Sequence, residues 1–165
     1  MPAHSELSIV DAQPGDVPVI LDFIRRLAEY EKLSHEMGAT EELLREYLFG
    51  ARPVAEAILA RWAGEAVGFA LFFGTFSTFV GKPGIWLEDL FVLPEHRRKG
   101  IGLALLGRVA EIAVERGCGR LEWSVLDWNE PALRVYRQLG AVAMSDWTTQ
   151  RLIGEPLLKL AQKKR

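Results

Sequence analysis

The stretch from residue 85 to residue 116 constrains the fold of this chain more than any other. An apolar run from Ile85 to Leu93 predicts a central strand that only Glu88 and Asp89 interrupt. A basic turn follows at residues 96–99, and then the pattern becomes that of an amphipathic helix. A strand, a cationic turn and a helix N-terminus together favour anion binding, because backbone N–H groups and the positive end of the helix dipole meet there.

Gly100 and Gly102 open the predicted helix, which runs from Ile101 to Arg116. Glycine matters at such a turn because a Cβ atom would hold an anion away from the backbone. The cationic residues Arg97 to Lys99 add a positive field at the same place. We therefore expect a phosphorylated ligand here; the alternative is a solvated basic loop that only begins a helix.

Two familiar phosphate motifs do not fit this turn. A P-loop requires Gly-x4-Gly-Lys-Ser/Thr, and the sequence contains no such string. A dinucleotide fingerprint requires a third small residue where this chain has Leu105, although Glu122 lies at about the spacing of a ribose-binding acid. That fingerprint also follows the first strand of its fold, whereas this turn lies past the middle of the chain. The ligand is therefore expected to be a different phosphate compound.

The remaining periodicities predict a mixed α/β fold. Ala63-Gly64-Glu65 is expected to join two strands in a hairpin, and Asp16 and Asn129 are candidate helix N-caps. Besides the elements above, the predicted order is a strand at 7–10, helices at 16–33 and 40–48, strands at 55–62 and 66–73, a strand at 121–126, a helix at 129–139 and a last antiparallel pair at 141–144 and 149–152.

The bulk properties narrow the function classes. The 165 residues are 49% hydrophobic with a net charge of -2, which gives no sign of nucleic acid or a membrane as a partner. Cys118 is the one cysteine, so no internal disulfide forms, and a reducing, cytoplasmic location is expected. The histidines show no metal-ligand spacing, so no metal is expected.

Two motifs resemble one enzyme superfamily. Arg97-x-x-Gly100-x-Gly102 after Leu90-Phe91-Val92 looks like motif A of the GNAT acetyltransferases. The string Asn129-Glu130-Pro131-Ala132 with Tyr136 and Gly140 resembles the motif B that follows it. The resemblance implies the GNAT fold, with a mixed, mostly antiparallel sheet flanked by helices on both faces, in one domain over residues 1–165.

Longer strings resemble one branch of that superfamily. Residues 86–92, 127–131 and 27–31 look like the spermidine/spermine (diamine) and thialysine acetyltransferases. This similarity implies transfer of an acetyl group from acetyl-CoA, the co-substrate, to a primary amine on a diamine, polyamine or lysine-like small molecule. The alternatives are acetylation of a protein N-terminus or lysine, and a non-catalytic acyl-CoA-binding module. Family members commonly form homodimers, and the apolar run at 153–161 suits docking on a partner or on its own domain.

The family motifs imply a set of acetyl-CoA contacts. The basic turn would hold the pyrophosphate, and the preceding strand would line the acetyl arm. The implied residues are Leu90, Phe91, Val92, Arg97, Arg98, Lys99, Gly100, Ile101, Gly102, Leu103, Asn129, Pro131, Ala132 and Tyr136.

Two residues are candidates for proton transfer. Tyr136 lies two helical turns after Asn129, so its phenol projects from the same face and can protonate the leaving sulfur. Glu88 resembles the family carboxylate that deprotonates the amine directly or through water. The alternative for Tyr136 is a core aromatic, and the alternative for Glu88 is a structural ion pair. Asp89 is expected on the opposite face of the strand, in a structural role.

A cationic amine calls for a groove that carries carboxylates. Tyr30 and Glu31 match family substrate positions, and Trp123 and Ser124 fall where family members touch both ligands. Each acid taken alone is more often a solvated surface charge. The complete set of expected substrate residues is Tyr30, Glu31, Glu88, Glu122, Trp123, Ser124 and Asp146.

Overall fold

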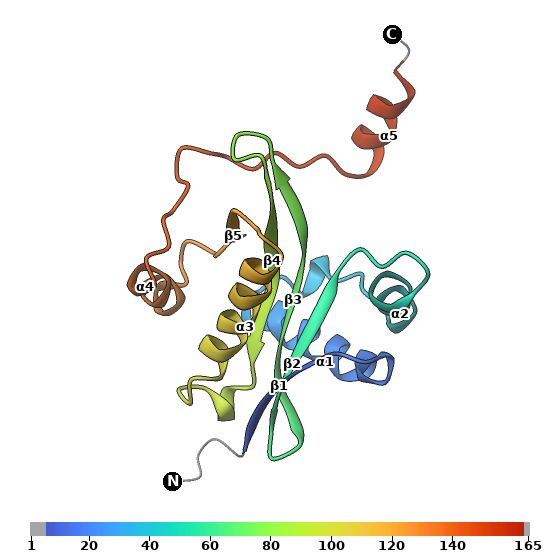
Figure 1. Cartoon of the computed structure of the whole chain (residues 1–165). Helices are drawn as coiled ribbons and strands as arrows, with labels where there is room; N and C mark the ends of the chain where they lie inside the picture. The colour runs from blue at the N-terminus through green and yellow to red at the C-terminus, as the bar shows by residue number, and fades with distance from the viewer. Residues whose placement is uncertain (1–5, 164–165) are drawn as a thin grey trace. The chain divides into compact units, whose positions relative to one another are not determined.

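A computed structural model describes residues 6–163 of the chain, with one sheet and helices around it (Figure 1). No helix in this range is long and apolar enough to cross a membrane. The elements are β1 (Leu7–Asp11), α1 (Val17–Tyr30), α2 (Glu41–Phe49), β2 (Glu56–Trp62), β3 (Glu65–Ser77), β4 (Lys82–Val92), α3 (Ile101–Glu115), β5 (Arg120–Trp123), α4 (Glu130–Gln138) and α5 (Gly154–Gln162).

The sheet has five strands in the order β1-β2-β3-β4-β5. The first four pair antiparallel, and β5 joins β4 in parallel after the crossover through α3. The predicted hairpin between β2 and β3 is confirmed, because Ala63 and Gly64 take φ angles of 49° and 87°. Positive φ at both central residues matches the twist of the flanking strands. The expected mixed, mostly antiparallel sheet is therefore present.

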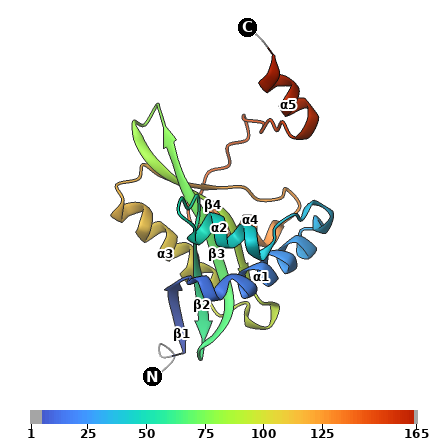
Figure 2. The same ribbon diagram turned by 90° about the vertical axis from the view of Figure 1, so that its right-hand side faces the viewer.

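Helices cover both faces of this sheet (Figure 2). Phe23 of α1 packs on Phe69 and Phe91, with ring centroids 5.8 and 5.7 Å apart. Because side chains alternate along a strand, Ile58 and Phe72 point the other way, toward α3. The apolar face of the helix predicted from Ile101 is buried, and the expectation of helices on both faces is confirmed. Its buried residues include Leu105, Leu106, Val109, Ile112 and Ala113.

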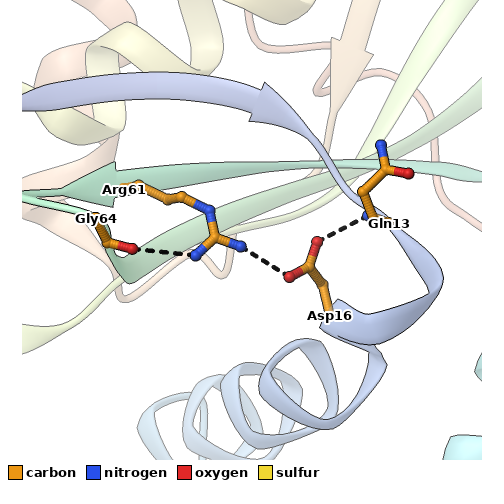
Figure 3. Close-up of polar contacts among 4 residues, drawn as sticks. All are labelled: Gln13, Asp16, Arg61 and Gly64. Atoms are coloured by element: carbon orange, nitrogen blue, oxygen red, sulfur yellow. Dashed lines mark hydrogen bonds and ion pairs between the residues drawn. The ribbon is translucent and has the colours of Figure 1, made fainter.

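The entry to α1 differs from the predicted helix cap. Asp16 occupies the N-cap position, yet its carboxylate accepts no capping hydrogen bond from α1. It accepts instead from the Gln13 N–H at 2.8 Å and from Arg61 Nη2 at 2.8 Å, while Arg61 Nη1 donates to the Gly64 carbonyl at 3.2 Å (Figure 3). Asp16 thus ties the start of α1 to the β2–β3 hairpin.

The chain divides into two compact units, Met1–Leu126 and Asp127–Arg165. The second unit contains α4 and α5, and neither helix buries a residue. The predicted strand pair at 141–144 and 149–152 is wrong, because both segments lack regular structure. Val142 is 81% exposed and Met144 61% exposed, so the alternating pattern has no sheet to pack against.

Candidate active site

The basic turn has the backbone geometry of an anion site. Arg98 and Gly100 have φ angles of 62° and 78°, and Gly100 begins α3 without a side-chain cap. Among residues 6–163, no backbone carbonyl accepts a hydrogen bond from the N–H groups of residues 98–100. These donors and the N-terminal end of α3 are therefore available to phosphate oxygens. The geometry fits the pyrophosphate expected at this turn.

The side chains of the turn are held by its surroundings. Arg97 Nε donates to the Val92 carbonyl at 3.0 Å, and its guanidinium lies 5.2 Å from the Tyr30 ring centroid. Lys99 Nζ lies 4.8 Å from the centroid of Trp62, the last residue of β2. The turn is therefore fixed to α1 and to the end of the β2–β3 hairpin.

Strands β4 and β5 separate beside this turn. Their pairing runs from Gly84 with Arg120 to Leu87 with Trp123 and then stops, although β4 continues to Val92. β5 is shorter than predicted, and Ser124 is an exposed residue just beyond it. Residues 89–92 thus pair with β3 alone among the described strands, and one backbone edge of this segment is unpaired.

A β-bulge marks the point of separation. Leu71 pairs with Asp89 and Phe72 pairs with Leu87, so Glu88 is an extra residue on β4. Trp86 and Phe73 are partners on the α1 face, and the Trp86 indole donates to Glu88 Oε2 at 2.9 Å. Asp89 shares a face with its partner Leu71, which belongs to the core cluster around Phe23. Both acids therefore face α1.

This arrangement corrects the expectation that Glu88 and Asp89 point to opposite faces. A regular strand alternates its side chains, but a bulge interrupts the alternation. Glu31, directly after α1, lies near enough for its charge to act on Asp89. Burial, and then the charges of Glu88 and Glu31, raise the pKa of Asp89 to about 7. Burial and the Glu88 charge also raise the pKa of Glu31.

Of the other expected substrate residues, Glu122 lies opposite Trp86 in the parallel ladder and therefore shares its face. An Arg120 Nη1 to Glu122 Oε1 distance of 3.8 Å makes a loose ion pair. Trp123 lies opposite Leu87, at the last paired position before the strands separate. Within residues 6–163, no three acidic, histidine or cysteine side chains are placed to hold a metal ion.

Some expected site residues belong to the second compact unit. Asn129 occupies the N-cap position of α4, and Pro131 and Ala132 are in its first turn. Tyr136 follows two helical turns after Asn129, as predicted. Asp146 is exposed and lies between α4 and α5.

A cavity of about 340 Å³ lies between α1 and the end of β4, and it combines expected site residues with Arg26 and Pro94, which sequence reasoning missed. Its lining residues are Arg26, Glu29, Tyr30, Phe91, Pro94 and Arg97. The Arg-Arg pair one turn before the Tyr-Glu pair was the available signal. A separate cavity of about 250 Å³ near the end of α3 contains no expected site residue, and Arg116 there is bound to Glu56 at 2.7 Å.

Comparison with known proteins agrees with this geometry. The model of the acetyltransferase (GNAT) family matches residues 21–141. A thialysine N-epsilon-acetyltransferase of Bos taurus is 41% identical over 94% of this chain and 97% of its own length. An L-ornithine N5-acetyltransferase of Arabidopsis thaliana is 33% identical over 88% of this chain and 84% of its own.

A solved structure supports the fold. An integron cassette protein from the mobile metagenome of V. cholerae superposes with a TM-score of 0.78 at 28% identity, over 96% of this chain and 99% of that one. The resemblance noted in the sequence, down to the thialysine branch, is confirmed. The chain therefore belongs to the GNAT acetyltransferase family and is an enzyme that transfers acetyl groups to amines.

Proposed function

We propose that this enzyme acetylates the terminal amine of a small diamine, polyamine or lysine-like molecule, with acetyl-CoA as the donor. The observation that carries the proposal is the convergence of Glu31, Glu88 and Asp89 where β4 leaves β5. Three carboxylates on one face attract a cation, and the unpaired edge of β4 leaves room for a thioester beside them. The names of the thialysine and ornithine relatives agree with a substrate of this kind.

The residues present fit acetyl-CoA, which would supply the acetyl thioester. The N–H groups between Arg97 and Leu103 would hold its pyrophosphate, because the turn is left-handed at two residues and the helix start is uncapped. Leu90, Phe91 and Val92 would line the acetyl arm along the unpaired edge of β4. From the second unit, α4 would contribute Asn129, Pro131 and Ala132. The family model spans both units, which supports a single functional domain.

Acetyl transfer requires one proton to leave the amine and another to reach the departing sulfur. We propose that Glu88 accepts the first, directly or through water, because its carboxylate is exposed and oriented by the Trp86 indole. Tyr136 Oη would donate the second. Tyr30, Glu31, Glu122, Trp123, Ser124 and Asp146 are the proposed substrate contacts.

The proposal extends to a homodimer in the cytoplasm. Apolar side chains of the second unit are exposed, among them Trp147 at 75% and Leu158 at 60%. An exposed apolar set of this size suits burial against a second copy of the chain. The single cysteine, Cys118, is free, as suits a reducing compartment.

An amine panel tests the function. The enzyme is incubated with acetyl-CoA and diamines, polyamines, thialysine, N-terminal peptides or lysine peptides, and free CoA thiol is followed. Thiol release with the small amines is expected. Release with peptides alone would replace the proposed substrate class, and tight acetyl-CoA binding without turnover on any amine would contradict catalysis.

The role of Tyr136 is tested by Tyr136→Phe. Loss of a general acid is expected to lower kcat by about 10²–10⁴-fold. Tyr47→Phe, on the exposed side of α2, is the matched control and should leave kcat unchanged. An unaltered kcat in Tyr136→Phe would assign that ring a packing role.

A further inference from the structure

Asp89 is a carboxylate that the fold leaves without a partner. Among residues 6–163, no donor forms a hydrogen bond to it and no cation pairs with it, so nothing supports the structural role expected from the sequence. Its oxygens are not sealed off either, because the one fully enclosed side-chain atom without a partner in the described chain is His96 Nδ1. A half-buried carboxylate of this kind is available to a ligand in the proposed amine site.

The surroundings of Asp89 make it a proton acceptor suited to neutral pH. Glu88 shares its face through the bulge, and Glu31 directly follows α1, so both charges that act on Asp89 are negative. Arg26 and Arg97 line the cavity beside the aromatic ring two residues further along β4. Burial and the two carboxylate charges raise the pKa of Asp89 to about 7. Proton acceptors work best when their pKa is close to the working pH.

Acetylation of an amine that arrives as an ammonium removes two protons from its nitrogen. The first leaves before attack, because the nitrogen needs a free electron pair. The second leaves while the new N–C bond makes the nitrogen positive again and the C–S bond breaks. Sulfur takes up one proton, which Tyr136 would supply and regain from solvent, so each turnover releases one net proton. The two nitrogen protons thus call for two transfers to the protein or to water.

We propose that Asp89 is a second catalytic carboxylate, which takes the proton that the ammonium loses before attack. Glu88 keeps the role proposed above and takes the proton lost during attack. Ionised Asp89 pairs with the ammonium, and proton transfer within this pair leaves a neutral amine beside a neutral acid. Partial burial favours that neutral pair, because charged groups lose hydration there. This inference rests on the proposed function and divides its proton transfers between two residues.

The pH dependence of the amine reaction tests the role of Asp89. Below pH 7 this carboxyl already holds a proton, so kcat/KM for the best amine of the panel should rise with pH through a limb near 7. Asp89→Asn should remove this limb and lower kcat/KM at about pH 8 by about 10²-fold or more. The KM for acetyl-CoA should stay the same. The ionisation of the amine itself lies near pH ~10 and is separate from the limb.

Stability measurements distinguish catalysis from a structural role. Asp89→Asn removes a partly buried, unpaired charge, so the variant is expected to be more stable at alkaline pH. A lower turnover in a more stable variant does not come from damage to the fold. Asp11→Asn, on an exposed residue of β1, is the matched control and should keep both the rate and the limb. A wild-type rate and limb in Asp89→Asn would overturn the proposal while leaving amine acetylation intact.

Proton release on binding tests the same residue without turnover. Putrescine is titrated calorimetrically into the enzyme at pH ~7 without acetyl-CoA, in two buffers that differ in ionisation enthalpy. About half of the Asp89 carboxyls hold a proton there, so the wild-type enzyme should release about half a proton per putrescine bound. Asp89→Asn should release much less. Equal release from the two proteins, or none from wild type, would overturn the assignment. Release by a wild-type enzyme that acetylates no amine would contradict the proposed function and support the place of Asp89 in the amine site.

Discussion

The two halves of β4 differ in their neighbours. Residues Lys82–Leu87 run beside β3, and from Gly84 onward they also pair with β5. Beyond the bulge at Glu88, residues 89–92 pair with β3 alone among the described strands. In the first half, Ile85 and Leu87 are buried, whereas in the second half Glu88 is exposed and Asp89 is partly buried. One continuous strand thus passes, within a few residues, from a buried half to a half that carries the proposed site carboxylates.

The change coincides with one inserted residue. The bulge at Glu88 turns two adjacent carboxylates to the same face, and pairing with β5 ends at the residue before it. Bulges re-aim side chains and end strand pairing. The same local irregularity can therefore create both the acidic cluster and the unpaired backbone edge. The regular half of β4 supplies the rigid support that such a site needs.

The largest expected effect is on kcat/KM and concerns Glu88 in the second half of β4. Glu88→Gln should lower kcat/KM for amines by about 10²–10⁴-fold, because it removes the proposed proton acceptor and keeps the side-chain shape. Stability should stay nearly constant, since the carboxylate is exposed and a glutamine side-chain oxygen can still accept the hydrogen bond from the Trp86 indole. Steady-state kinetics and urea unfolding measure the two effects. Glu65→Gln, on the exposed start of β3, is the control. Unchanged turnover in Glu88→Gln would exclude this residue as the base.

The second prediction concerns the stability cost of the acidic cluster. The folded pKa of Asp89, about 7, lies above the unfolded value of about 3.9, so its stability contribution is fully present below pH ~4 and is lost as the pH rises through 7. Asp89→Asn should therefore stabilise the protein at pH 8 by on the order of 2–4 kcal/mol. The gain should shrink as the pH is lowered toward 4.

Urea unfolding at a series of pH values measures this gain. Asp11→Asn changes an exposed carboxylate and serves as the control. A loss of stability in Asp89→Asn at pH 8 would show that the ionised carboxylate is stabilised in the fold by partners other than the acidic cluster.

A smaller effect concerns how closely the β3 backbone approaches each half of β4. Gly68 lies opposite Val92, and a Cβ there would come within 2.6 Å of the Phe91 carbonyl oxygen. Gly74 lies opposite Ile85, and a Cβ there would meet nothing within 4 Å. Gly68→Ala should cost about 1–3 kcal/mol of unfolding free energy, whereas Gly74→Ala should change it by less than about 0.5 kcal/mol. Equal denaturant midpoints for the two variants would show that the second half of β4 shifts to accommodate a Cβ atom at residue 68 without loss of unfolding free energy.

The sequence was sufficient wherever periodicity and local chemistry decided the structure. The buried face of α3, the glycine turn and the hairpin at Gly64 follow from spacing and backbone preference. The bulge did not follow, because the apolar run from Ile85 to Leu93 has no residue that marks an insertion. Register depends on the partner strand, so the shared face of Glu88 and Asp89 became visible only through their pairing with β3.

The missed parts of the site have a similar cause. Arg26 belongs to a helix that contributes mostly apolar side chains to the core. It lines the same cavity as Arg97, which follows it by more than half the length of the first unit. The strand pair predicted after Ala141 failed because alternation describes only one strand, and a strand requires a neighbour to satisfy its backbone. Long-range pairing was the missing information in both cases.

The contact between Lys99 and Trp62 has a thermodynamic consequence. A lysine side chain on a free loop loses rotational freedom when an anion orders the loop, and that loss weakens binding. Here the ring of Trp62 already restricts Lys99, and Arg97 is held by Val92 and Tyr30. Much of the rotational freedom of these two side chains is therefore lost during folding and not on binding. The enthalpy of the proposed phosphate contacts would then appear as affinity, so Trp62 at the end of the β2–β3 hairpin would influence how tightly the proposed donor is held.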